Sequence, residues 1–112
     1  MNYLITESQV SNLAMKYLNS TYGLEKYRTD NHPTLIFFVK GDLAYAEYDV
    51  KRNILYFSSK LRNEIGRSLE KIFSMRVVKT EDVFDKWVGQ YVDLDVTNLY
   101  FSEALPYNIN SI

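Results

Sequence analysis

The residue types that most often perform nucleophilic catalysis are sparse in this chain. It has many serines and threonines but no cysteine, and its single histidine, His32, lies in the run Asp30-Asn31-His32-Pro33. Nucleophilic catalysis needs a nucleophile, a base and a group that orients the base, and the sequence contains no Gly-x-Ser-x-Gly elbow. Its four glycines are too scattered to form a phosphate-binding loop. We therefore expect His32 to be a polar loop residue and the protein not to be an enzyme.

Carboxylates offer the strongest case for an enzyme. Glu47, Asp49 and Lys51 form an acid-x-acid-x-Lys run, and Glu7 lies in a predicted helix. The order of predicted elements resembles that of restriction-endonuclease-like nucleases, in which carboxylates hold a divalent metal and a lysine assists the attacking water. That family carries its acid-x-Lys pair on the third strand, whereas the third predicted strand here, 54–57, has no carboxylate. A metal-dependent nuclease is thus the third hypothesis.

Charge is balanced overall but unevenly distributed. The 13 basic and 14 acidic residues argue against a general attraction to nucleic acid. Residues 58–79 carry six basic and two acidic side chains, whereas residues 81–103 carry six acidic and one basic. Complementarity within the chain explains this pattern, and a polar partner surface is the alternative. Asp93 and Asp95 could bind a cation from one face of an extended segment, but we favour a solvated strand edge as the explanation of this pair. We expect neither metal nor cofactor.

Four basic residues suggest an alternative function. The predicted order of one helix, three strands and a second helix is similar to that of the double-stranded-RNA-binding domain, whose basic second helix contacts phosphates across a groove. The resemblance would make Lys60, Arg62, Arg67 and Lys71 the nucleic-acid contacts. The family's dense lysine cluster and Gly-Pro-x-His loop are missing, and i,i+4 pairs such as Lys60 with Glu64 are also typical of a solvated helix face. Nucleic-acid binding is therefore the alternative hypothesis.

Hydrophobic periodicity predicts the elements that position these residues. Thr6 to Gln9 fits a capping box, and the apolar stripe that follows predicts a helix over 7–22. Residues 24–33 are polar and interrupted, which is typical of a loop. Three β-rich segments separated by short turns predict an antiparallel meander, and they are 34–39, 43–48 and 54–57. The first of these strands is apolar on both faces and should be covered on both.

Two further helices are expected after the meander. Ser58 or Ser59 can cap the first of them, which continues to Phe73 with a single apolar stripe. Residues 76–79 favour a short fourth strand, and Thr80 then caps a third helix. The apolar side chains from Val83 to Val92 form a wider band than a surface helix needs, so something must cover them.

The C-terminal stretch is too apolar to be a disordered tail. We predict one α+β domain over 1–98, built from a helix, a three-stranded antiparallel meander and two further helices, with an extended docking arm over 99–112. The arm docks on its own domain or on a neighbouring chain, and we favour the neighbour because Pro106 and the lack of helical periodicity suit an extended reach. Large aromatic and apolar side chains provide the predicted protein interface, namely Trp87, Tyr91, Leu99, Tyr100, Phe101, Leu105 and Tyr107.

Several short segments resemble small uncharacterised proteins of marine phage and viral sequence collections. These segments lie in the first 90 or so residues and are Leu4-Ile5-Thr6-Glu7-Ser8-Gln9, Lys16-Tyr17-Leu18-Asn19, Ile36-Phe37-Phe38-Val39-Lys40, Glu47-Tyr48-Asp49, Ile54-Leu55-Tyr56 and Lys86-Trp87-Val88. The resemblance implies a phage origin and brings no known activity or site residues. Small non-enzymatic viral proteins are commonly virion parts or host-factor binders.

The sequence as a whole favours a protein–protein interaction module. It is expected to bind a protein partner or a second copy of itself, as a virion component or host-factor binder in the virion or the host cytoplasm. No apolar run approaches the roughly 18–20 residues that cross a bilayer, so we expect no membrane association. The absence of cysteine agrees with a reducing compartment.

Overall fold

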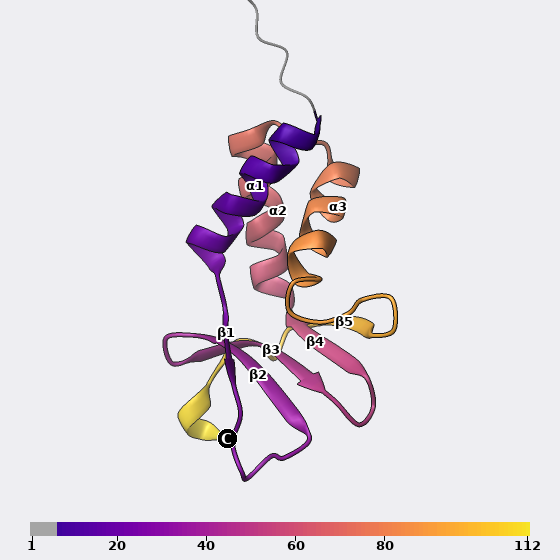
Figure 1. The fold of residues 1–112 in the computed structure, drawn as a ribbon. Coiled ribbons are helices and arrows are strands. Elements are labelled where there is room, and N and C mark those ends of the chain that lie inside the picture. The colour runs from indigo at the N-terminus through magenta and orange to yellow at the C-terminus, as the bar shows by residue number, and fades with distance from the viewer. Residues whose placement is uncertain (1–6) are drawn as a thin grey trace, which may run out of the picture.

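The computed structural model describes residues 7–112, which form three helices and one sheet (Figure 1). This confirms the predicted α+β class. In chain order the elements are α1 (Glu7–Tyr22), β1 (Glu25–Tyr27), β2 (Leu35–Lys40), β3 (Leu43–Asp49), β4 (Ile54–Ser58), α2 (Ser59–Phe73), α3 (Val77–Val88), β5 (Asn98–Ser102), β6 (Tyr107–Asn108) and a short 3₁₀ turn (Ile109–Ser111).

The predicted antiparallel meander is the centre of the sheet. Strands β2, β3 and β4 pair antiparallel in sequence order, β1 adds to β2, and β5 adds to β4 in the parallel direction. Two strands share one edge of β3, because β4 pairs with Ala46 to Asp49 while β6 pairs with Leu43 and Ala44. The C-terminal segment thus completes an edge that β4 leaves when it turns into α2.

The prediction of a continuous loop over 24–33 was wrong at its start. Residues 25–27 form β1, in which Glu25, Lys26 and Tyr27 pair with Val39, Phe38 and Phe37 of β2. All three β1 side chains are exposed, so the strand has no alternation of apolar and polar residues that could have revealed it. Its pairing is decided by the free backbone groups of β2 and not by local preference.

The predicted fourth strand over 76–79 was also wrong. These residues open α3, and Thr80 lies inside the first turn, where its hydroxyl donates to the Val77 carbonyl at 2.6 Å instead of capping the helix. Ser74, in the left-handed conformation with φ 53°, ends α2 and turns the chain back at once. A helix satisfies its own backbone groups, whereas a strand here would have needed a partner.

The helical side of the sheet holds the main core. Trp87 is 0% exposed and packs edge to face on Phe57 of β4, at 6.2 Å between ring centroids. Its indole N–H donates to Asn19 of α1 at 3.0 Å. One side chain thereby joins the sheet, α1 and α3. Leu13, which the sequence placed in the apolar stripe of the first helix, is half-exposed, and Thr6 of the predicted capping box lies outside the described residues.

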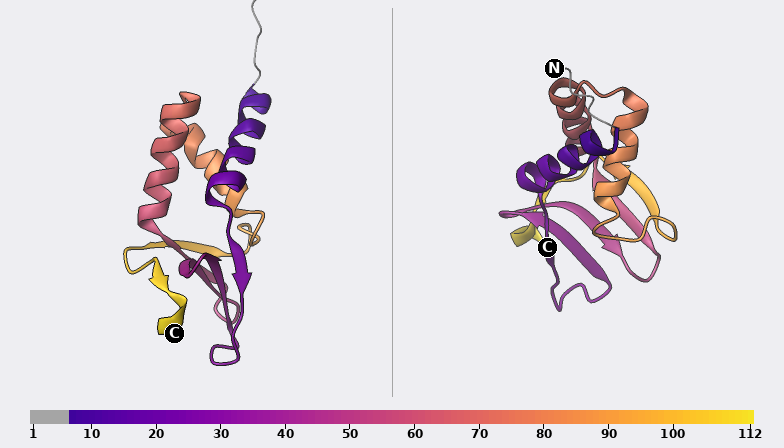
Figure 2. Two further views of the ribbon diagram at one scale, coloured as in Figure 1. Left: turned by 90° about the vertical axis from the view of Figure 1, so that its left-hand side faces the viewer. Right: turned by 45° about the horizontal axis from the view of Figure 1, so that its top comes forward.

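The C-terminal arm docks on its own domain, not on the neighbouring chain that the sequence favoured. Its first residues form β5 within the sheet, so no boundary at residue 98 separates a domain from an arm. Its last residues cover the second apolar face of β2 and β3, where Phe37, Val39 and Ala44 are buried beneath Tyr107, Ile109 and Ile112. Figure 2 shows this segment lying away from the three helices. The prediction that both faces of the first meander strand are covered is confirmed.

Removal of residues 103–112 should uncover this second apolar cluster. Phe37 and Val39 would become solvent-exposed, and exposing a large apolar side chain costs about 1.5–3 kcal/mol. We expect the truncated protein to unfold at a lower urea concentration and to bind a dye that recognises apolar surface. Ile112→Ala, which keeps the pairing of β6 with β3, should lose much less stability. Equal urea midpoints for the truncated and full chains would contradict this assignment.

Candidate functional site

Strand β5 is held in place by side chains at both of its ends. At the start, Asn53 adopts φ 57° in the β3–β4 turn, and its backbone carbonyl accepts from the Asn98 N–H at 3.0 Å. The Asn53 side-chain amide donates to the Val96 carbonyl, and its oxygen accepts from Thr97 at 3.1 Å. At the other end, the Ser59 hydroxyl donates to the Ser102 carbonyl at 3.3 Å. The strand is therefore a fixed element, although it forms the margin of the sheet.

One side of β5 has no partner strand within residues 7–112, and we call this side the β5 edge. Proteins usually protect such edges with charged residues, proline, a bulge or very short length. The opposite margin of the sheet, β1, has three residues of which Glu25 and Lys26 are charged. β5 has five residues, Asn98-Leu99-Tyr100-Phe101-Ser102, without charge or proline. The β5 edge is thus open to pairing with another chain.

Exposed apolar side chains lie on β5 and in the groove next to it. Tyr100 is 55% exposed and Phe101 49%, and Val77, at the start of α3 two turns before Phe84, is 60% exposed. Val77 and Phe101 line a groove together with polar residues of α2, and we call it the α2–α3 groove. Its lining consists of Ser59, Arg62, Asn63, Arg67, Glu70, Val77, Thr80 and Phe101. Apolar side chains beside arginines are typical of protein interfaces.

The predicted interface residues divide into buried and exposed sets. Trp87 and Leu105 are buried within the chain. They therefore form no part of the surface. Tyr91 is half-buried, and its hydroxyl accepts from the Leu24 backbone N–H at 3.1 Å. Leu99 and Tyr107 are half-buried as well. Only Tyr100 and Phe101 of the predicted set are exposed.

The four basic residues of α2 do not form a single patch. Arg62 is half-buried with its guanidinium 4.7 Å from the centre of the Phe84 ring, a cation–π contact that fixes it against α3. Arg67 lines the α2–α3 groove with Arg62, whereas Lys60 and Lys71 are exposed outside the groove. Because the groove also contains Glu70 and apolar side chains, its chemistry suits a protein better than a phosphate backbone.

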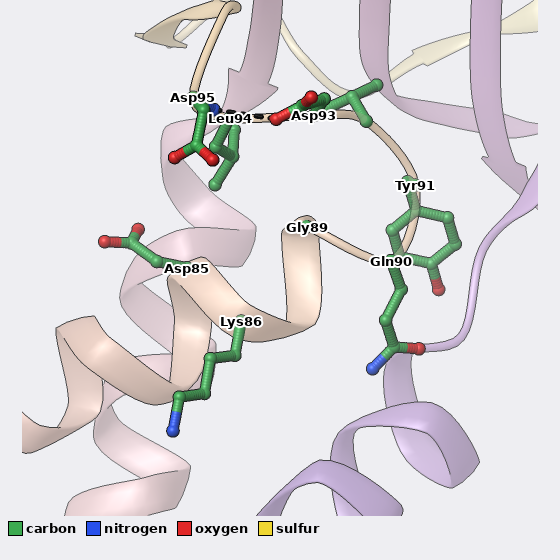
Figure 3. Close-up of a pocket in the computed structure, with 9 residues that line it drawn as sticks. Asp85, Lys86, Gly89, Gln90, Tyr91, Asp93, Leu94 and Asp95 are labelled. Atoms are coloured by element: carbon green, nitrogen blue, oxygen red, sulfur yellow. Dashed lines mark hydrogen bonds between the residues drawn. The ribbon is translucent and has the colours of Figure 1, made fainter.

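Asp85, Asp93 and Asp95 line a hollow between α3 and the loop that follows it, together with the basic Lys86 (Figure 3). Asp85 projects from α3, while Asp93 turns its carboxylate to the Asp95 backbone N–H, which donates at 3.0 Å. Partial burial raises the pKa of Asp85, and the nearby Arg62 guanidinium offsets part of this rise. Within residues 7–112, no three His, Cys, Asp or Glu side chains are grouped closely enough to hold a metal ion.

The three residues of the acid-x-acid-x-Lys run have different surroundings and form no common site. Glu47 accepts a hydrogen bond from the Tyr107 hydroxyl at 2.7 Å, and burial together with this carboxylate raises the pKa of Tyr107. Asp49 instead pairs with Arg52 at 3.8 Å across the following turn. Lys51 is exposed in that turn. Glu47 thus anchors the C-terminal segment, and His32 packs edge to face on Phe37 at 6.0 Å as a loop residue.

Comparison of the chain with known proteins gives no indication of its function. The chain matches no family model, no curated protein and no solved structure. None of the described helices has the length and hydropathy of a membrane span. The candidate site is therefore defined by its exposed surface chemistry.

Two residues of the candidate site were not predicted from the sequence. Val77 belongs to it because α3 begins there, whereas a β-branched pair next to charged residues predicted a strand. Asn53 positions β5 from a turn that was assigned no role. Asparagine tolerates the left-handed backbone of such turns, and this preference was the available signal.

Tyr107→Phe should remove the hydrogen bond to Glu47 without removing the ring. We expect a loss of about 1–2 kcal/mol in the free energy of unfolding at pH 7, since bonds to charged groups contribute somewhat more than neutral ones. The folded pKa of Tyr107 is raised, so its contribution is complete below the unfolded pKa of about 10 and declines as the pH rises above it. Urea unfolding at several pH values should show the difference from wild type shrinking in alkali. A difference that stays constant to pH 11 or so would contradict this.

Replacing Lys60, Arg67 and Lys71 with Gln tests the nucleic-acid hypothesis. If these residues form a solvated face, the free energy of unfolding should change by less than about 1 kcal/mol. Gel shifts with double-stranded RNA and DNA should detect no complex in either protein. Salt-sensitive binding by wild type that the triple variant loses would instead support the nucleic-acid function.

Proposed function

We propose that the protein is a non-enzymatic protein–protein interaction module whose contact surface is the β5 edge with the adjoining α2–α3 groove. The observation that carries the proposal is the exposure of Tyr100 and Phe101 on an unpaired strand, together with the exposed Val77 in the groove that Phe101 also lines. Single exposed apolar residues are ordinary on protein surfaces. Aromatic residues gathered along an open strand edge support a binding role, because they provide contact area and the strand provides backbone hydrogen bonds.

The contact surface is also organised before any partner arrives. Phe101 packs on Phe84 of α3 at 5.9 Å between ring centroids, and Tyr100 lies 6.2 Å from Tyr56 of β4. Hydrogen bonds from Asn53 and Ser59 hold the ends of the strand. A surface that is already ordered loses little conformational entropy on binding, which favours affinity. We propose a virion component or host-factor binder as the biological setting, on the resemblance of the sequence to phage proteins.

A matched pair of double variants tests this function. Val77→Lys with Tyr100→Lys adds two charges to the proposed surface, and Leu13→Lys with Ile72→Lys adds two charges at residues that are equally exposed on α1 and α2. Each tagged protein is purified from the cells that produce it, with an untagged copy present, and bound proteins are quantified by mass spectrometry. We expect a partner that wild type and the Leu13/Ile72 variant recover and that the Val77/Tyr100 variant recovers at least about tenfold less, a difference of about 1.4 kcal/mol.

Two results would overturn the proposal. One is recovery of every bound protein equally by both double variants, which would place binding elsewhere. The other is release of the bound proteins by nuclease, which would show contact through nucleic acid. Circular dichroism of each variant must match wild type, and the exposure of all four residues makes that outcome expected.

A further inference from the structure

We propose that the β5 edge pairs with the β5 edge of a second copy of this chain, as antiparallel strands related by a two-fold axis at Tyr100. This rests on the proposed function and names the partner that the edge fits. The pairing would join two sheets into one continuous sheet. Three features of the strand favour this pairing: the backbone groups that face outward, the side chains that the pairing brings together, and the absence of charge.

The outward backbone groups follow from the parallel pairing of β5 with β4. The Asn98 N–H donates inward, to the Asn53 carbonyl at 3.0 Å. Because residues of a parallel strand alternate in direction, the backbone groups of Tyr100 and Ser102 also face β4, and those of Leu99 and Phe101 face the free edge. The unpaired groups of the strand are therefore the N–H and C=O of Leu99 and Phe101.

An antiparallel partner centred on Tyr100 satisfies all of these groups. Leu99 then lies opposite the second copy's Phe101, and each residue donates to and accepts from the other. The two-fold axis repeats this exchange with Phe101 opposite the second copy's Leu99. Tyr100 is the middle residue of β5, so this register also uses the whole strand, and centring on Leu99 or Phe101 would leave part of the strand unpaired.

The same register places like side chains together. Leu99 and Phe101 share the face of the sheet that the helices cover, since Leu99 packs on the main core and Phe101 on Phe84. Each exposed Phe101 ring would contact the second copy's Leu99 there. On the other face, the two Tyr100 rings would meet across the axis and extend the row begun by Tyr56. Aromatic and aliphatic pairs of this kind stabilise antiparallel strands.

Charge permits self-association at this edge and opposes it at the other. β5 carries no charge, and Glu103, the first charged residue after it, would lie opposite the second copy's Thr97. Like charges therefore do not face each other across the axis. A symmetric pairing of β1 would instead bring Lys26 against the second copy's Lys26 if centred there, which is unfavourable. Self-complementarity is thus specific to the β5 edge.

Complementary charges at the axis test the register. Tyr100→Lys and Tyr100→Glu each place two like charges opposite each other, whereas a mixture of the two variants places opposite charges there. Multi-angle light scattering of wild type over a concentration series should give twice the chain mass. Each variant alone should associate at least about tenfold more weakly, and the equimolar mixture should recover the dimer. Tyr27→Lys, the same change on the exposed tyrosine of β1, should remain dimeric.

Each other outcome counts against the proposal. A wild-type protein that stays monomeric up to about 1 mM would overturn it. A Tyr100→Lys variant that dimerises as wild type does, or a mixture that stays monomeric while both variants are folded, would overturn the register at Tyr100. The proposed function fails separately: a monomeric wild type whose recovered partner still depends on Val77 and Tyr100 would retain the contact surface and replace the second copy with another protein.

Discussion

The direct passage of β4 into α2 at Ser58 is the constraint on which the rest of the structure depends. Ser58 is 0% exposed, and its hydroxyl accepts from the Leu61 N–H at 3.2 Å, which begins the helix. The same hydroxyl donates to the Leu105 carbonyl at 3.0 Å, 47 residues further along the chain. Because β4 ends at Ser58 and continues as a capped helix, Leu43 and Ala44 of β3 have no partner from β4. The hydrogen bond to Leu105 holds the C-terminal segment near them, and β6 pairs with both. One side chain thus both caps the helix and fixes the C-terminal segment.

Most aromatic side chains of residues 7–112 are buried or half-buried in the molecule. Phe57 contacts Phe84, Trp87 and Phe101 edge to face, so side chains of β4, α3 and β5 meet at one ring. Edge-to-face contacts add about 0.5–1.5 kcal/mol beyond the burial of the rings themselves. Within residues 7–112 the exposed rings are those of Tyr27, Tyr100 and Phe101, and two of these three lie on β5.

Local sequence patterns predicted the helices and strands that have a regular apolar periodicity or clear turn residues. The other strands form because of pairing between residues far apart in the sequence. The helices over α1 and α2 and the three meander strands follow from periodicity and turn residues, because these depend on near neighbours in the chain. β1 and β5 have no such signal: the three side chains of β1 are all exposed and show no alternation, and β5 pairs in parallel with a strand more than forty residues earlier. For the same reason Glu47, which resembled a metal ligand in sequence, is a hydrogen-bond acceptor for Tyr107. At the candidate site, Tyr100 and Phe101 were predictable as interface residues, but Trp87 and Leu105 could be placed only by the packing around them.

The docking of the C-terminal segment on its own domain also creates the edge that remains open. A chain that ended after α3 would leave β4 as the last strand, with its outer backbone groups unpaired. β5 satisfies those groups, yet every strand added to an open sheet presents a new edge of its own. Closure into a barrel would remove the edge, but β1 is too short and too far across the sheet order to meet β5. The sheet therefore has two margins that cannot pair with each other, and the chain protects only β1 with charge. An uncharged β5 held rigid by Asn53 and Ser59 is the residue pattern expected of an edge that is completed by another chain.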